Sequence, residues 1–216
     1  MKRITKLTAS MAIAASTLLG AQQAQALAIS ASDGVNTIYA SDTDNDGFVS
    51  FFSAIGAWNF NVVTGFADPA IGTPEVYGLH LNSVNAGGGT GTLTVMITDT
   101  NVTKSTAPFI TSLGGVTGGT TSFATYLSSN NTEFSLDTLM SASGPYSGAF
   151  SATDSGYING LTNPYSMTLV GYITHDQKTD ISSFDYDVQI PEPMTLALFG
   201  AGLIGMGFVG RRKRQS

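Results

Sequence analysis

The chain has 216 residues, with 9 lysines and arginines against 15 aspartates and glutamates. Both ends are basic, so the segment 27–190 holds only Lys104 and Lys178 against 14 acidic residues and has a net charge of −12. Such a segment would repel a phosphate backbone, which excludes nucleic acid as a partner. The chain contains no cysteine, which excludes disulfides, thiolate catalysis, zinc–thiolate sites and iron–sulfur clusters.

The first 26 residues have the pattern of a secretory signal peptide. Three bases precede an uncharged segment at residues 7–19, and the small-residue pattern Ala24-Gln25-Ala26 follows. This pattern predicts export through the Sec translocon and cleavage by signal peptidase after Ala26, with Ala28 as the alternative cleavage site. The uncharged segment has 13 residues, fewer than the roughly 17 to 25 needed to span a membrane.

Residues 27–189 are predicted to form one acidic all-β domain. Apolar and polar residues alternate with period two, most clearly at residues 58–62, 92–98 and 184–188, and no helical period extends beyond a turn or two. A segment of this length can bury one core. Ten strands are expected, at residues 35–40, 47–52, 58–62, 76–81, 92–98, 122–127, 132–136, 148–152, 166–173 and 184–188.

Turn signals separate these strands, which favours an antiparallel β-sandwich with either jelly-roll or immunoglobulin-like topology. Residues 86–91 and 114–121 are rich in glycine and are predicted to be mobile loops. Trp58, the only tryptophan, is predicted to anchor the core rather than to present a sugar-binding surface, because it alternates with asparagines on its strand. The predicted turn signals are Asp68-Pro69, Gly87-Gly88-Gly89, Gly114-Gly115, Gly118-Gly119, Ser143-Gly144-Pro145 and Asn163-Pro164.

One motif in this domain has the chemistry of a cation site. Asp42, Asp44 and Asp46 alternate in the segment 42–47, which ends in glycine, and alternating carboxylates in a tight turn can place their oxygens around Ca²⁺. An EF-hand is not expected, because Ser53 occupies the position of the last glutamate ligand and the residues after the loop favour a strand. Two interpretations remain, a weak extracellular calcium loop and a simple hairpin turn.

The sequence gives no catalytic motif. The nearest approach to a GxSxG elbow, residues 144–148, has the wrong spacing. Pairs of carboxylates suited to a glycosidase would arise by chance among so many acidic residues. His80 and His175 do not form a metal-binding motif, and each is expected to be hydrated or paired. The prediction is therefore a protein without enzymatic activity.

The C-terminal segment has three parts in a fixed order. Pro191-Glu192-Pro193 precedes an uncharged segment of 17 residues, 194–210, and the bases Arg211, Arg212, Lys213 and Arg214 follow. Seventeen residues form a short membrane-spanning helix. By the positive-inside rule the basic cluster stays in the cytoplasm, which places the acidic domain on the far side of the membrane.

This order resembles the PEP-CTERM sorting signal of Gram-negative bacteria, which the membrane enzyme exosortase recognises. The resemblance covers about residues 190–214 and rests on Pro191-Glu192-Pro193, the apolar glycine-rich segment and the basic cluster; Met194 departs from the small residue usual at its position. It implies a transient anchor in the inner membrane, cleavage near Pro191-Glu192-Pro193, and delivery to the cell surface or to an extracellular matrix of exopolysaccharide.

Two functional hypotheses follow. The first is an exported structural or interaction protein of the cell surface or matrix, with exopolysaccharide as its partner. The second is a calcium-assisted β-sandwich that binds or cleaves carbohydrate, with Asp42, Asp44 and Asp46 as calcium ligands. The positions of exposed tyrosines should distinguish the two, because a groove lined by such rings would favour the second. The tyrosines concerned are Tyr39, Tyr77, Tyr126 and Tyr157.

Overall fold

The computed structural model describes residues 27–67, 70–71, 76–103 and 107–191, and this part of the chain is built from strands and the turns between them. Within it there is no helix that could cross a membrane; the predicted helix 194–210 lies outside the described residues. The ten strands are β1 (Leu27–Ser32), β2 (Thr37–Ser41), β3 (Phe48–Ile55), β4 (Trp58–Phe66), β5 (Val76–Gly87), β6 (Gly91–Val102), β7 (Ala107–Ser128), β8 (Thr138–Ile158), β9 (Tyr165–His175) and β10 (Ile181–Pro191).

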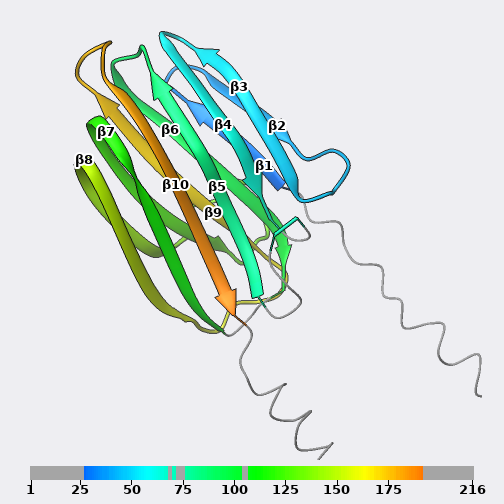
Figure 1. Ribbon diagram of the computed structural model, residues 1–216. Helices are drawn as coiled ribbons and strands as arrows, with labels where there is room; N and C mark the ends of the chain where they lie inside the picture. The colour runs from blue at the N-terminus through cyan, green and yellow to red at the C-terminus, as the bar shows by residue number, and fades with distance from the viewer. Residues whose placement is uncertain (1–26, 68–69, 72–75, 104–106, 192–216) are drawn as a thin grey trace, which may run out of the picture.

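All strand pairs are antiparallel, and one hydrogen-bonded sheet folds into two layers (Figure 1). The sheet passes from one layer to the other within β7: residues 110–117 pair with β10, whereas residues 120–128 pair with β9. β8 pairs with both halves of β7 and changes layer with it. The front layer therefore has the order β8-β7-β10-β5-β4-β3, and the back layer has the order β8-β7-β9-β6-β1-β2. This arrangement confirms the all-β antiparallel prediction.

Glycines allow β7 to change layer. A Cβ atom on Gly119 would lie 2.0 Å from the backbone oxygen of Thr174 in β9, and one on Gly115 would lie 2.3 Å from the backbone oxygen of Ser183 in β10. Only glycine permits so close an approach between backbones. The prediction of a mobile loop at residues 114–121 is therefore wrong, because these glycines lie inside a strand rather than at a turn.

The core lies between the two layers. Phe123 of the back layer places its ring 4.9 Å from that of Phe184 and 5.2 Å from that of Tyr186, both in β10 of the front layer. Trp58 is 2% exposed and its ring lies 4.8 Å from His175, which confirms its prediction as a core anchor. Each large apolar side chain buried in this way contributes about 1.5 to 3 kcal/mol.

The loop between β7 and β8 covers the outer face of the back layer. Phe134 donates its backbone N–H to Thr98 Oγ1 at 2.9 Å, and Ser166 Oγ donates to the backbone oxygen of Thr132 at 2.7 Å. The strand predicted at residues 132–136 is therefore wrong: its apolar residues serve a loop that packs on β6 and β9. β1, which the sequence pattern did not predict, is almost wholly buried.

One other turn prediction is also corrected. Ser143-Gly144-Pro145 lies within β8, at the place where that strand changes layer with β7. The turn predicted at Gly87-Gly88-Gly89 does join β5 to β6, but the loop expected at residues 86–91 is shorter, because β5 continues to Gly87 and β6 begins at Gly91. Asn163-Pro164 also lies in a connection, the one between β8 and β9.

Candidate functional site

The described part of the chain ends inside the C-terminal motif. Pro191 is the last residue of β10 and pairs with Val76 of β5, and the preceding Ile190 is fully buried. The folded domain therefore reaches the motif with no linker before it. Other predicted residues lie outside the described ranges: Ala24, Ala26, Glu192, Pro193, Arg211, Arg212, Lys213 and Arg214.

The structure brings the three predicted cation ligands together in the loop between β2 and β3. One carboxylate oxygen from each of Asp42, Asp44 and Asp46 lies within 4.8 Å of the others. Asp42 organises the loop by accepting backbone hydrogen bonds from Asn45 and Gly47, each at 2.8 Å. The left-handed backbone of Asn45 (φ 57°) and Gly47 (φ 78°) turns the chain around these oxygens.

Mutual repulsion within this cluster shows in the pKa values. Partial burial would raise the pKa of Asp42, but the hydrogen bonds from Gly47 and its neighbours outweigh it and hold the pKa below its ordinary value. The pKa of Asp44 is raised, first by its side-chain hydrogen bond with Asp42 and then by the charge of Asp46. A divalent cation would relieve this repulsion, and carboxylate oxygens are the ligands that Ca²⁺ prefers.

The cation loop leads directly into a row of side chains on the outer face of the front layer. Phe48 donates its backbone N–H to Asp46 Oδ1 at 2.9 Å. From Phe48 the cross-strand neighbours are Phe66, His80 and Asp187 in order. The rings of Phe48 and Phe66 are 5.5 Å apart, and those of Phe66 and His80 are 6.4 Å apart.

A depression of about 500 Å³ lies beside His80 and Asp187 in this row, with Gln189 also at its lining. Gly78 and Ile71 also line it, and the lack of a side chain on Gly78 lets Ile71 pack closely, since a Cβ atom there would lie 3.2 Å from Ile71 Cδ1. Burial raises the pKa of Asp187, although the His80 imidazole and a hydrogen bond from Gln189 Nε2 (3.4 Å) act in the opposite direction. These side chains together offer hydrogen-bond acceptors and donors next to aromatic rings.

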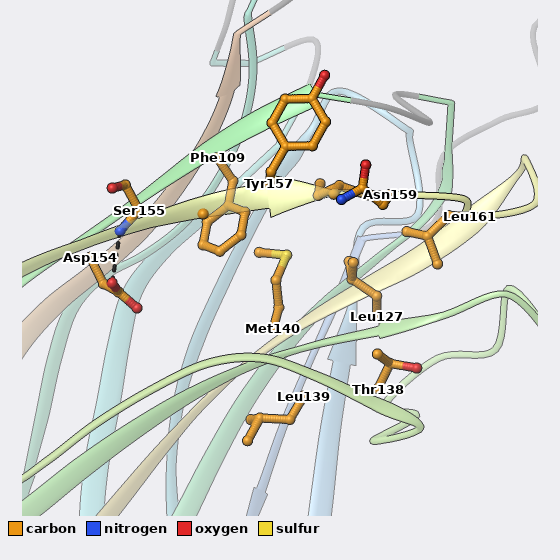
Figure 2. Close-up of a pocket in the computed structure, with 12 residues that line it drawn as sticks. Phe109, Leu127, Thr138, Leu139, Met140, Asp154, Ser155, Tyr157, Asn159 and Leu161 are labelled. Carbon is orange, nitrogen blue, oxygen red and sulfur yellow. Dashed lines mark hydrogen bonds between the residues drawn. The ribbon is translucent and has the colours of Figure 1, made fainter.

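A second cleft, of about 340 Å³, opens at the β8 edge between the two layers (Figure 2). Its interior is apolar: Met140 points toward Phe109, and Leu127 lies beside them, whereas Asp154 and Asn159 supply polar groups at the rim. Asp154 Oδ1 accepts the backbone N–H of Ser155 at 2.8 Å. The chemistry of this cleft suits an apolar group more than a charged one.

The four tyrosines proposed as discriminators occupy different environments. Tyr77 is buried and donates to Asp99 Oδ2 at 2.8 Å, and Tyr126 is half-buried. Tyr39 is exposed on β2, with its ring 5.8 Å from that of Phe134. Tyr157 contributes to the rim of the edge cleft, but its ring points to the opposite side of β8 from Phe109 (Figure 2). No large aromatic groove is formed by these four rings.

Sequence reasoning missed the row on the front layer. His80 was expected to be hydrated or paired, and Asp187 was regarded as one of many acidic residues; their pairing depends on the register between β5 and β10. The alternation of Asp185 and Asp187 with buried neighbours did show that both face outward. The sequence could not show that β5 pairs with β10, because Asp187 follows His80 by 107 positions along the chain.

Comparison with known proteins places the C-terminal segment among the sorting signals of exported proteins. Residues 189–214 match the family model described as the PEP-CTERM protein-sorting motif. The chain therefore carries a PEP-CTERM sorting motif, and this motif marks a substrate of exosortase. It is an exported protein that passes through the membrane. No curated protein matches the chain.

Solved structures with similar chain traces include two β-domains. One is the K1 cleaved adhesin domain of Lys-gingipain from Porphyromonas gingivalis W83, with 12% identity, coverage of 68% of this chain and 98% of that one, and a TM-score of 0.36. The other is the C-terminal CBM6 of LamC, a marine laminarinase from Zobellia galactanivorans, with 12% identity, coverage of 65% and 98%, and a TM-score of 0.28. Similarity at this level does not bear on function.

Proposed function

We propose that the acidic β-domain is the cargo of the sorting signal and acts at the cell surface or in the extracellular matrix as a structural or interaction protein, in association with exopolysaccharide. The observation that carries this proposal is the junction at Pro191, where the last strand of the domain runs into the PEP-CTERM motif. Exosortase would therefore release an intact folded domain. The charge of −12 on residues 27–190 suits a soluble matrix component.

The N-terminal boundary is proposed at the bond after Ala26, cut by signal peptidase following Sec export. Cleavage after Ala28 would remove Leu27 and Ala28, which are both 1% exposed and belong to β1. It would also remove the backbone oxygen of Leu27, which accepts the N–H of Asp42 at 2.8 Å. The domains are then residues 1–26, 27–189 and 190–216, as the sequence pattern predicts, and the last strand of the folded domain extends two residues into the third of these, to Pro191.

At the other end, residues 194–210 are proposed to form a transient anchor in the inner membrane, held by the basic cluster at 211–214. Exosortase would cut near Pro191-Glu192-Pro193. Two prolines in three residues resist helix formation and keep the backbone extended for the enzyme. Because Ile190 is buried, a cut on its C-terminal side leaves the core complete.

The jelly-roll is proposed over the immunoglobulin-like topology. In a jelly-roll, eight successive segments form two sheets in the orders 1-8-3-6 and 2-7-4-5, a double Greek key. Here β5, β6, the two halves of β7, the two halves of β8, β9 and β10 follow these orders, and β1 to β4 extend both layers at one edge. This agreement supports the jelly-roll.

The second candidate function is calcium-assisted carbohydrate binding, with Asp42, Asp44 and Asp46 as the calcium ligands. It is favoured by the hydrogen bond between Phe48 and Asp46, because a bound cation would order the strand that presents Phe48 to the outer face. A cleaving activity would need two carboxylates poised about a sugar bond, and the row beside Phe48 brings only Asp187 into the depression among the described residues.

The test of the main proposal uses the native host. Intact mass spectrometry of the protein from culture medium and washed cells should give a product that begins at Leu27 and ends near Pro191-Glu192-Pro193. Immunodetection should place this product in the surface or matrix fraction, together with exopolysaccharide. A product that still ends at Ser216, or one confined to the inner membrane, would contradict the proposal.

A further inference from the structure

The two outer faces of the sandwich differ in how they are covered. On the back layer the loop 129–137 packs across β6 and β9, through the hydrogen bonds of Phe134 and Ser166. On the front layer, the outer face carries side chains of large exposed area instead. Phe52 of β3 is 84% exposed, and Val116 of β7 is 52% exposed. An exposed phenylalanine on a flat sheet is a feature that a ligand can use.

A polar row connects these two apolar residues across the strands. From Phe52 the cross-strand neighbours are Asn61, Asn85, Ser183 and Val116 in order. Asn85 Nδ2 donates to Asn61 Oδ1 at 2.9 Å and to the backbone oxygen of Ser83 at 2.9 Å. These bonds fix both amides and leave the Asn61 amino group and the Asn85 side-chain oxygen for a ligand.

The row of Phe48, Phe66, His80 and Asp187 runs parallel to this one, farther along the same strands. The front face, defined here as these two rows, thus has aromatic rings on β3 and β4 and hydrogen-bonding groups on β5 and β10. Four steps between strands, from Phe52 to Val116, span roughly 19 Å at the usual strand spacing. This length suits an extended chain laid across the strands rather than a small molecule.

The charge of the front face limits the kind of polymer that could bind there. The front face carries the carboxylate of Asp187, and Asp185 on β10 is also exposed, accepting the backbone N–H of Ser83 at 2.7 Å. Among the described residues the single base is Lys178, which lies in the turn before β10. An acidic polymer or an anionic membrane would therefore be repelled. Rings that stack on C–H faces, with amides and a carboxylate that bond hydroxyls, fit an uncharged glycan.

We propose that the front face binds uncharged polysaccharide, with one chain segment laid along each row. In one row Phe52 stacks on a sugar ring while Asn61 and Asn85 bond hydroxyl groups, and in the parallel row Phe48 stacks while His80 and Asp187 bond hydroxyl groups. This inference rests on the proposed matrix function and names its ligand class and its site. The cation loop supports the site from one edge, because it holds the first residue of β3 through Asp46.

The test uses the mature protein released by the native host and that host's cell-free polysaccharide, separated by anion exchange into neutral and acidic fractions. In native gels, the neutral fraction should retard the protein. Phe52→Ala should weaken this binding about tenfold, as expected from the loss of one stacked ring. The matched control is Tyr39→Ala, which removes another exposed ring, on the back layer, and should bind as the unchanged protein does.

His80→Ala, in the parallel row, provides a second variant, and thermal melting confirms that each variant is folded. If the unchanged protein binds the neutral fraction and both variants bind it equally well, the site is wrong while the proposed function stands. Binding to the acidic fraction alone, or to neither fraction, overturns the inference. The matrix function itself is judged separately, by the mass and location of the released protein.

Discussion

Replacement of Gly119 by alanine tests the crossing of β7 between the two layers. In the structure the backbone at Gly119 lies so close to β9 that a Cβ atom would be 2.0 Å from the Thr174 oxygen and 3.2 Å from the His175 Cα atom. Both obstacles are backbone, which cannot rotate away as a side chain can. Either β7 or β9 must move, and the pairing between them supports the whole back layer.

The size of the effect follows from this distance. Ordinary contacts between carbon and a carbonyl oxygen are about 3.3 to 3.6 Å, so the strands must separate by more than 1 Å. Overpacking of a well-packed interior costs about 1 to 3 kcal/mol, and rigid backbone on both sides favours the upper end. With a urea m-value of about 2 kcal/mol/M, a loss of about 3 kcal/mol lowers the unfolding midpoint by about 1.5 M.

The assay is urea unfolding of the purified domain, followed by tryptophan fluorescence of the buried Trp58. Gly114→Ala is the matched control in the same strand, because its Cβ would meet only the Phe150 oxygen, at an ordinary 3.7 Å. That variant should be neutral or should gain about 0.4 to 1 kcal/mol from a less flexible unfolded chain. Equal midpoints for Gly119→Ala and Gly114→Ala would show that Gly119 is in a loop, as its sequence suggests.

Three further predictions concern the other sites. Calcium at 10 mM should stabilise the domain by about 1.4 kcal/mol if its site has a Kd of about 1 mM, and Asp44→Asn should remove most of this gain. If the melting temperature rises no more in calcium than in sodium chloride of matched ionic strength, the domain has no calcium site. Burial lowers the pKa of His175 below its ordinary 6.5, against the opposing charge of Asp180. Below about pH 6.5 the unfolded chain therefore binds a proton that the folded chain does not. The free energy of unfolding should then fall by up to about 1.4 kcal/mol per pH unit until the folded-state pKa is reached. His175→Gln should lack this component, and identical pH profiles for the two proteins would contradict the argument. Glu192→Ala should leave membrane insertion intact and block release of the domain, as judged by the mass of the cell-associated product; normal release would remove Glu192 from the recognition motif.

The strands that could be predicted are those in which one face is buried and the other is wet. Residues 184–188 show this pattern, and they form part of β10 with alternate residues inside the core. β1 was not predicted in this way: nearly all of its residues are buried, so its two faces do not differ in exposure as those of a half-exposed strand do. The strand predicted at residues 132–136 is a loop because its backbone bonds to the back layer, as Phe134 does to Thr98, and such a distant contact leaves no local pattern.

For the candidate site, the sequence contained the local part. Asp42, Asp44 and Asp46 converge because a tight turn with glycine places alternate side chains together, which depends on neighbours in the chain alone. The row from Phe48 to Asp187 depends instead on the registers of three strand pairs, and one of these, β5 with β10, joins distant segments. A shift of one residue in any register would move these side chains to the other face, and local pattern does not determine such a register.

By itself the sequence determined that this protein is exported and what class of fold it has. The sorting motif is read as a linear segment, and the acidic all-β character follows from composition and period. Only the tertiary structure decided that the glycines of β7 lie inside a strand and that Phe52, Asn61, Asn85 and His80 share one open face. The physical reason is that both facts arise from close approach between backbones and from pairing across long loops, and these interactions exist only after the two layers have packed together.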